Sequence, residues 1–196
     1  MGKIFFTSDL HLNHNRDFIY KPRGFNNIEE HDKGILRNLQ AVVNPEDDLY
    51  ILGDLFLGVR SQGYAPSLEL LDRLPGKVHF IYGNHDTIKK QMAIQELIEQ
   101  HEGWESLGYG SPFKYRKYHF FLSHYPNLTY NFDSNSALRR QCINLCGHCH
   151  TKDKFLDIDK GLIYHVELDA HGSFPIEIED IIADIMEYKT KINQNA

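Results

Sequence analysis

Long apolar segments are missing from this chain of 196 residues. Spanning a bilayer takes about 20 consecutive apolar residues, and no run in the sequence approaches that length. The first residues also lack a basic segment followed by an apolar one, which is the pattern of a secretory leader. We therefore expect a cytoplasmic protein without a membrane span.

Cysteine is scarce as well, with three residues in all: Cys142, Cys146 and Cys149. An odd number of cysteines in a chain without an export pattern predicts reduced thiols rather than a disulfide framework. It also weakens an interpretation as a haem-attachment protein, because both chemistries normally need an exported or oxidising setting.

Basic residues are fewer than acidic ones. Lysine and arginine number 21 against 27 aspartates and glutamates, which gives a formal net charge of -6. A polynucleotide is held by a basic field that this balance does not supply. Tight, non-specific binding to long nucleic acids is therefore not expected, although the balance leaves room for a local basic groove.

Histidine, in contrast, is abundant, with 12 residues, and residues 145–150 read Leu-Cys-Gly-His-Cys-His. Cys146 and Cys149 form a C-x-x-C that fits a redox pair, and with His150 they also fit a haem-attachment pattern. His148 and His150 fit a metal site instead, since alternate side chains of an extended segment point the same way. The stretch alone does not choose between these three chemistries.

The apolar pattern predicts the elements of an α/β fold. Strands are expected at residues 3–7, 49–52, 78–82, 142–146 and 161–168, with an antiparallel pair over 112–123 that turns near Lys117. Helices are expected at residues 28–43, 67–74, 87–100 and 180–188. This order indicates an α/β sandwich with more than one sheet. We expect a single domain over residues 1–190 and a polar tail over 191–196.

Five polar clusters each follow a predicted strand. They are Asp9 with His11, Gly53-Asp54, Gly83-Asn84-His85-Asp86, Ser123-His124 and Gly147-His148-Cys149-His150. The carboxyl ends of strands are where open α/β sheets bind ligands, so we expect the five clusters to converge. Their imidazole, carboxylate and carboxamide groups suit borderline divalent cations such as Mn, Fe, Zn or Ni. A shared carboxylate would let them hold two ions.

In this order the clusters resemble the calcineurin-like metallophosphoesterase superfamily. The stretch Thr7-Ser8-Asp9-Leu10-His11-Leu12 and the short length are most similar to its compact bacterial and phage members. The resemblance implies a four-layer α/β/β/α sandwich of two facing mixed β-sheets. The sequence departs from the family pattern at Ser123, where the family has glycine before the histidine.

Carried over position by position, the resemblance implies a set of metal ligands. One ion would be held by a carboxylate and two imidazoles: Asp9, His11 and His150. The other would be held by a carboxamide and two imidazoles: Asn84, His124 and His148. Asp54 would bridge the two ions. The implied cofactors are two divalent cations per chain, with Mn favoured and Fe, Zn or Ni as alternatives.

The same resemblance implies the chemistry. Hydroxide held between the two ions would attack phosphorus, and His85 would assist the departing alkoxide without binding metal. This predicts a phosphodiesterase that also accepts phosphomonoesters. Gly53, Gly83 and Gly147 would let the backbone turn sharply enough to aim the ligands.

Substrate and partners are constrained only broadly. The chain is too short for a large specificity cap, so a small phosphoester is expected, with a nucleotide or cyclic nucleotide favoured and a nucleic-acid end also compatible. His14 and Arg23 are predicted as substrate contacts, and Arg16 and Arg60 are further candidates. No membrane partner is expected, and the oligomeric state stays open, a homodimer included.

Two other functions fit part of the sequence. A non-catalytic interaction module would keep the metal ligands without catalysis, and a thiol-disulfide oxidoreductase would use Cys146 and Cys149. Among the remaining polar residues, Asp86 is expected to cap the helix that follows it. Asp169 and His171 are expected to have structural or surface roles.

Overall fold

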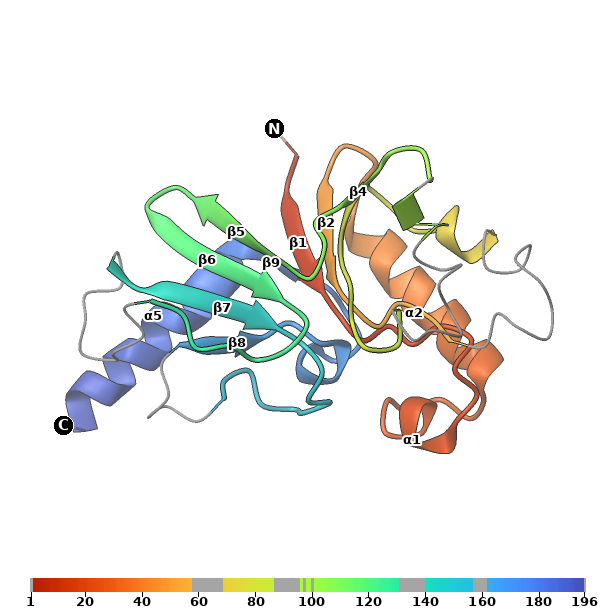
Figure 1. The fold of residues 1–196 in the computed structure, drawn as a ribbon. Helices are drawn as coiled ribbons and strands as arrows, with labels where there is room; N and C mark the ends of the chain where they lie inside the picture. The colour runs from red at the N-terminus through yellow and green to blue at the C-terminus, as the bar shows by residue number, and fades with distance from the viewer. Residues whose placement is uncertain are drawn as a thin grey trace.

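Two β-sheets face each other at the centre of the molecule, as Figure 1 shows in the computed structural model. The structure describes residues 2–57, 69–86, 96, 98–99, 101–130, 140–156 and 162–195. The first sheet, of order β4-β3-β2-β1-β9, consists of β1 (Ile4–Thr7), β2 (Asp48–Leu52), β3 (Lys77–Ile81), β4 (Trp104–Ser106) and β9 (Ile176–Glu177). The second, of order β5-β6-β7-β8, consists of β5 (Gly110–Tyr115), β6 (Tyr118–Ser123), β7 (Cys142–Cys146) and β8 (Ile163–His165).

The strand directions send the predicted clusters to common edges. In the first sheet β1, β2, β3 and β4 run parallel, and β9 pairs antiparallel with β1. In the second, β5 and β6 form an antiparallel hairpin while β6, β7 and β8 run parallel. Both sheets are mixed, so the predicted α/β class with two facing mixed sheets is confirmed. The loops after β1, β2 and β3 leave one edge together, and so do the loops after β6 and β7.

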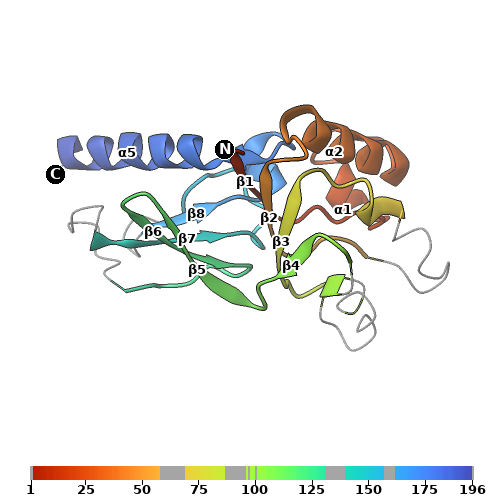
Figure 2. The ribbon, with the colours of Figure 1, turned by 90° about the horizontal axis from the view of Figure 1, so that it is seen from above.

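The first sheet is buried on both faces, because successive side chains of a strand point to opposite sides. Phe5 packs into an apolar cluster with Ile35 and Leu39 of helix α2 (Ile28–Val42). Phe6 packs into a second cluster that includes Leu145 of the second sheet and the helix α5 (Ile178–Asn195). Figure 2 shows α2 and the second sheet on opposite sides of the first sheet. The first sheet is therefore the buried middle layer that carries three of the five clusters.

The boundaries of the two long helices follow from local signals. The side chain of Asn27 accepts a hydrogen bond from the N–H of Glu30 at 2.9 Å, which caps the start of α2. The prediction of a helix at residues 28–43 is confirmed within one residue. Helix α5 begins before and ends well after the predicted range of 180–188, because its last turns are polar and give no apolar periodicity.

Short elements account for most of the other differences. Helix α1 (Asp17–Tyr20), β4 and β9 are too short to leave a periodic pattern, and none of them is predicted. The predicted strand at 161–168 is shorter, because a 3₁₀ helix (η3, Leu168–His171) follows β8. Most of the predicted helix 87–100 and all of residues 58–68 lie outside the described part of the chain. Among the helices described, none is long and apolar enough to cross a membrane.

Candidate metal centre

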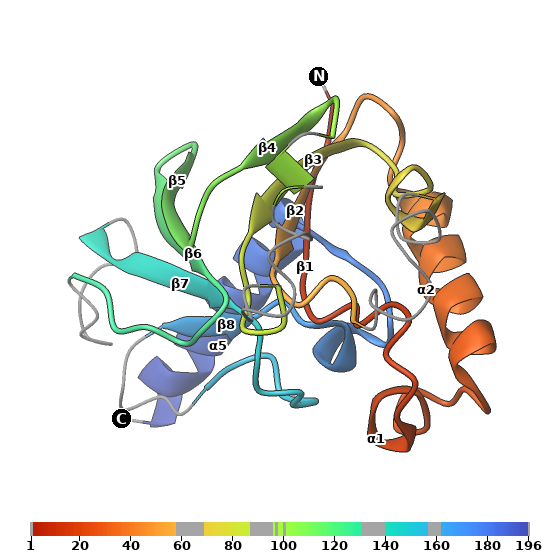
Figure 3. The same cartoon turned by 45° about the vertical axis from the view of Figure 1, so that its right-hand side comes forward.

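The five predicted clusters meet at one place, where the loops after β1, β2, β3, β6 and β7 come together. Figure 3 shows β1 running towards this end of the molecule, with α1 beyond it. Atoms that bind one divalent ion at about 2.0–2.2 Å lie roughly 3–4 Å from one another. Distances between side-chain atoms therefore decide which residues can share an ion.

The first group contains Asp9, His11 and His150. The Nε2 atom of His11 lies 3.1 Å from Nε2 of His150 and 3.8 Å from Oδ1 of Asp9, and Nε2 of His150 lies 3.6 Å from the same oxygen. Oδ2 of Asp9 accepts hydrogen bonds from the hydroxyl of Ser8 and the N–H of His148. Oδ1 is buried and has no hydrogen-bond partner in the described part of the chain. A buried, unpaired carboxylate oxygen facing two imidazoles fits a cation.

The second group contains Asn84, His124 and His148. Nε2 of His124 lies 3.0 Å from Oδ1 of Asn84 and 3.2 Å from Nδ1 of His148. The other ring nitrogen of His124 lies 2.9 Å from the backbone oxygen of Leu52, and an N–H donated to that oxygen leaves Nε2 as an acceptor. Two acceptors that face each other at 3.0 Å fit a shared cation better than a hydrogen bond.

Asp54 lies between the two groups. Its Oδ2 atom is 3.7 Å from Nε2 of His11 and 3.6 Å from Nε2 of His124, while Oδ1 accepts a hydrogen bond from the N–H of His85 at 2.9 Å. Burial, with the nearby charge of Asp9, raises the pKa of Asp54 to about 7. Without a cation this carboxylate is poorly stabilised, so the position favours positive charge.

The backbone of the site is strained. Five residues of the two groups and the bridge have left-handed φ angles: Asp9 57°, His11 48°, Asp54 54°, His148 75° and His150 48°. Residues with a Cβ rarely adopt this region, and each such position costs of the order of 1–3 kcal/mol. Surrounding contacts must hold these loops in place.

The glycines at the site, Gly53, Gly83 and Gly147, allow neighbouring loops to approach each other closely. Of the three glycines predicted to turn the chain at the site, Gly53 has a left-handed φ, of 93°. Gly83 and Gly147 do not have left-handed φ angles. A Cβ at Gly147 would lie 2.2 Å from Oδ2 of Asp9, so this glycine lets the β7 loop approach the β1 loop.

Two buried carboxylates hold the strained loops, Asp86 in a role other than the predicted one and Glu167 without having been predicted. Asp86 accepts hydrogen bonds from the N–H groups of Asp54, Leu55 and Gly83 at 2.7–3.1 Å, which ties the β2 loop to the β3 loop. The helix it was expected to cap lies outside the described residues. Glu167 accepts hydrogen bonds from the N–H groups of Cys149 and Thr151. It thereby supports the backbone on either side of His150.

Arg23 does not line the site as predicted. Its guanidinium is 1% exposed and forms two hydrogen bonds with the carboxylate of Asp169, at 3.0 and 2.7 Å. It also donates to the backbone oxygen of Asp9 at 2.8 Å. Asp169 in turn lies 3.0 Å from Nδ1 of His150. Arg23 is therefore a structural residue, and Asp169, for which a structural or surface role was expected, orients a predicted ligand.

These contacts explain the ionisation of Asp169. Burial on its own would raise its pKa, but the hydrogen bonds from His150 and Arg23 outweigh that effect and hold the pKa well below its usual range. The carboxylate is therefore charged and accepts a hydrogen bond from the N–H at Nδ1 of His150. That arrangement leaves Nε2 of His150 free to face Asp9.

We expect Arg23→Ala to lower the free energy of unfolding by about 3–5 kcal/mol, because the buried carboxylate of Asp169 loses its partner. A substrate contact would instead raise KM and leave stability unchanged. Urea unfolding of the purified variant measures the difference, with Arg37→Ala as the control, since Arg37 is exposed on α2. Equal stability of Arg23→Ala and the unmodified protein would contradict the structural role.

His14 also differs from its predicted role as a substrate contact. It is 6% exposed, and its Nδ1 atom lies 3.1 Å from Nδ1 of His11. Burial, with His85 beside it, lowers the pKa of His14 to about 4. His14 therefore contacts the ring nitrogen of His11 that does not face Asp9. Of the other candidates, Arg16 is exposed near α1, and Arg60 lies outside the described residues.

His85 occupies the position between the first group and solvent. Its ring centroid lies 5.1 Å from that of His11, and its Nε2 atom lies 3.8 Å from Oδ2 of Asp54. Burial, followed by the proximity of His124, lowers its pKa. An anion bound beside His85 would act in the opposite direction, since negative charge favours the protonated imidazole.

The cysteines do not support redox chemistry. Cys146 is buried in β7, and burial raises the pKa of its thiol well above the ordinary value. Burial also raises the pKa of the Cys149 thiol. A reactive C-x-x-C needs a lowered thiol pKa, usually at a helix N-terminus, and a loop follows β7 here. The stretch at 145–150 therefore serves the site through its histidines.

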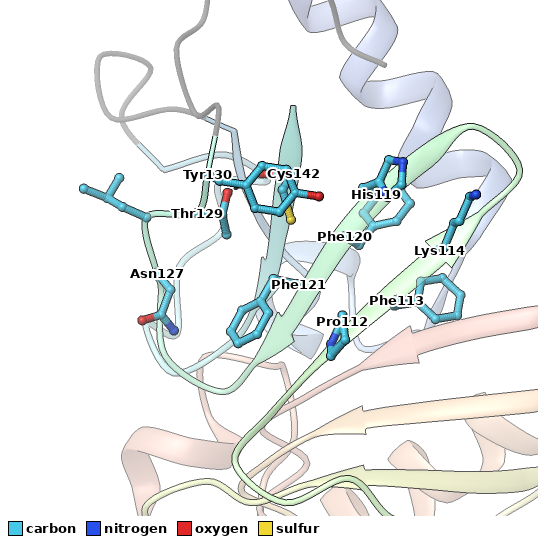
Figure 4. Close-up of a pocket in the computed structure, with 11 residues that line it drawn as sticks. Pro112, Phe113, Lys114, His119, Phe120, Phe121, Asn127, Thr129, Tyr130 and Cys142 are labelled. Atoms are coloured by element: carbon cyan, nitrogen blue, oxygen red, sulfur yellow. Dashed lines mark hydrogen bonds between the residues drawn. The ribbon is translucent and has the colours of Figure 1, made fainter. Parts of the chain in front are cut away.

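A cavity of about 530 Å³ opens on the other side of the second sheet, away from these groups. Figure 4 shows it between the outer faces of β5 and β6 and the segment that contains Asn127, Thr129 and Tyr130. Phe121 and Tyr130 give it an apolar lining. None of the predicted site residues lines it.

Comparisons with known proteins place the chain among related sequences. A family model described as calcineurin-like phosphoesterase matches residues 2–189. An uncharacterized protein of Methanocaldococcus jannaschii is 36% identical over 135 residues, which cover 68% of this chain and 65% of that protein. The gene 66 protein of Mycobacterium phage L5 is 36% identical over 87 residues, which cover 44% of this chain and 41% of that protein. The chain thus spans less than two thirds of the length of either relative.

Among solved structures, a protein of unknown function from Aquifex aeolicus superposes with a TM-score of 0.62. The superposition covers 93% of this chain and 99% of that one, at 22% sequence identity. At this identity the likeness shows the fold alone.

Proposed function

The chain belongs to the calcineurin-like phosphoesterase family, and on that premise we propose that it is a hydrolase of phosphodiesters that uses two divalent cations. The observation that carries the proposal is the position of Asp54. One of its oxygens lies 3.7 Å from His11 and 3.6 Å from His124, so a single carboxylate can reach both groups.

The residues present fit such a pair of ions. In this proposal one ion is held by Asp9, His11 and His150, the other by Asn84, His124 and His148, and Asp54 is shared. The unpaired buried oxygen of Asp9 supports the first assignment, and the facing acceptors of Asn84 and His124 support the second. When bound, two such cations acidify a water molecule and neutralise the phosphoryl oxygens.

Residues of the chain deliver the proton to the departing group and hold the loops of the site. Hydrolysis forms a bond between a water oxygen and phosphorus, breaks the bond from phosphorus to the departing oxygen, and leaves one proton of the water on that oxygen. We assign to His85 the delivery of this proton, because it lies beside Asp54 and is partly open to solvent. Asp86, Glu167 and Asp169 keep the loops in position through buried hydrogen bonds.

The proposed substrate is a small phosphodiester, with a nucleotide or cyclic nucleotide favoured and phosphomonoesters accepted. The formal charge of -6 argues against long polynucleotides, although a nucleic-acid end is compatible with it. Mn is the favoured ion, since imidazole, carboxylate and carboxamide ligands suit a borderline cation.

The proposal predicts the metal stoichiometry. Metal-stripped protein titrated with Mn²⁺ should bind two equivalents, and its melting temperature should rise. At about 100 times Kd each site adds about 2.7 kcal/mol of stability, which corresponds to roughly 5–10 °C for a chain of this size. Calorimetric titration and thermal unfolding measure both quantities. Binding of a single equivalent would contradict the shared-carboxylate arrangement.

A further inference from the structure

Phe18 stands at the side of the site where His85 lies. It belongs to α1, where its neighbours Ile19 and Tyr20 are buried while Phe18 itself is 69% exposed. Its ring meets the ring of His14 edge-on at 5.8 Å, and His14 lies 5.5 Å from His85. Because the two buried neighbours anchor the helix, the exposed ring is held beside the site.

Tyr125 stands beside the other group of ligands. Its ring meets that of His148 at 4.7 Å and that of His124 at 5.0 Å, in both cases edge to face. The ring is 47% exposed. Its backbone oxygen accepts hydrogen bonds from the side chains of Ser123 and Asn127, at 2.7 and 2.8 Å. The turn is therefore fixed, and the phenol presents a surface next to the predicted metal ligands.

Two exposed aromatic rings thus flank different halves of one polar site. Neither ring is among the proposed ligands, and each leaves apolar surface in water next to histidines of the site. A ring in this position can stack on a planar group, an interaction that is strong for nucleobases and tolerant of their identity. The arrangement matches a diester, in which phosphorus carries two organic groups.

We propose that Phe18 and Tyr125 are specificity residues that bind planar rings, nucleobases or aryl groups, on the two sides of a phosphodiester. Phe18 takes the departing group, because it lies on the side of His85. Tyr125 takes the group that stays on phosphorus. This inference rests on the proposed function and adds to it a preference, among phosphodiesters, for those that carry a ring on each side.

Two aryl diesters distinguish the proposed contact of Tyr125 from that of Phe18. Bis(p-nitrophenyl) phosphate and methyl p-nitrophenyl phosphate release the same p-nitrophenolate but keep a ring or a methyl group on phosphorus. After division by the statistical factor for two equivalent leaving groups and by the ratio of the uncatalysed rates of the two diesters with hydroxide, the unmodified protein should prefer the first substrate by about 10-fold in kcat/KM, as one stacked ring predicts. Tyr125→Ala should reduce this ratio to about 1, and Tyr125→Phe should keep it.

Phe18→Ala should behave differently. It should lower kcat/KM for both substrates by about 10-fold and leave their ratio unchanged, because both release the same ring. Tyr130→Ala is the matched control, since Tyr130 is 61% exposed on the outer side of the second sheet and should change neither quantity. Retention of the ratio in Tyr125→Ala, or a ratio near 1 in the unmodified protein, would overturn the inference while metal-dependent hydrolysis continued. If neither diester is hydrolysed, the proposed function itself is overturned.

Discussion

Replacing Asp54 by asparagine is expected to lower kcat/KM for bis(p-nitrophenyl) phosphate by roughly 10³-fold or more, about 4 kcal/mol in the activation barrier. Asparagine has nearly the same shape, and its oxygen can still accept the hydrogen bond from the N–H of His85. What it loses is the negative charge that lies between His11 and His124. The variant should therefore fold normally and bind fewer Mn²⁺ ions than the unmodified protein.

The pKa of Asp54 gives the same variant a second readout. In the folded chain this pKa is about 7, above the value of roughly 3.9 for an unfolded aspartate, so folding disfavours the charged form. The penalty grows as the pH rises from about 4 to about 7 and is complete above that range. At pH 8, metal-stripped Asp54→Asn should therefore be at least as stable as the metal-stripped unmodified protein.

Asp48→Asn is a suitable control for this experiment, because Asp48 lies at the opposite end of the same strand and pairs with His79. It should change neither activity nor metal content. Undiminished activity of Asp54→Asn with both ions bound would refute the shared-carboxylate mechanism. A large loss of stability in Asp54→Asn at pH 8 would show that the carboxylate has a structural role instead.

The second large effect is expected from His85→Asn, and it should depend on the leaving group. For a cyclic nucleotide, whose departing group is a sugar alkoxide, loss of the proton donor should lower kcat by roughly 10²- to 10⁴-fold. For bis(p-nitrophenyl) phosphate, whose departing phenolate needs little help from a proton, the loss should be less than about 10-fold. Steady-state kinetics with both substrates at saturating Mn²⁺ measure the contrast.

His119→Asn is the matched control for His85→Asn, since His119 lies beside the cavity on the outer face of the second sheet (Figure 4). It should leave both activities unchanged. If His85→Asn lowers the two activities equally, proton transfer from His85 is excluded, and a role in shaping the site remains. Loss of a metal ion from this variant would show that His85 is a ligand.

The candidate ligands could be predicted from the sequence because each follows a strand directly. Where β1 or β7 ends, the position of Asp9 or His148 is determined within a few residues of chain, and parallel strands bring such loops to one edge. Local sequence therefore contains most of the information about this part of the site.

The supporting residues could not be predicted in the same way. Arg23 and Asp169 are separated by 146 positions, and neither stands in a motif. An arginine in a loop has the same local pattern whether it meets a substrate or a buried carboxylate. Asp86 illustrates the same limit, because its place after a strand is typical of a helix cap, whereas its hydrogen bonds reach back to Asp54. Only the folded arrangement distinguishes these roles.

The pairing of β9 with β1 has a consequence for the order of folding during synthesis. Phe5 and Phe6 are translated well before their partners on one side, Glu177 and Ile176, which lie about 170 positions later in the sequence. The ion pair between Arg23 and Asp169 also cannot form before that later segment has been translated. Contacts so distant along the chain form slowly. A growing chain that already contains all seven proposed ligands would therefore still lack Glu167 and Asp169, which hold His150 and its neighbours in place. We expect it to capture metal only after this later segment has joined the fold.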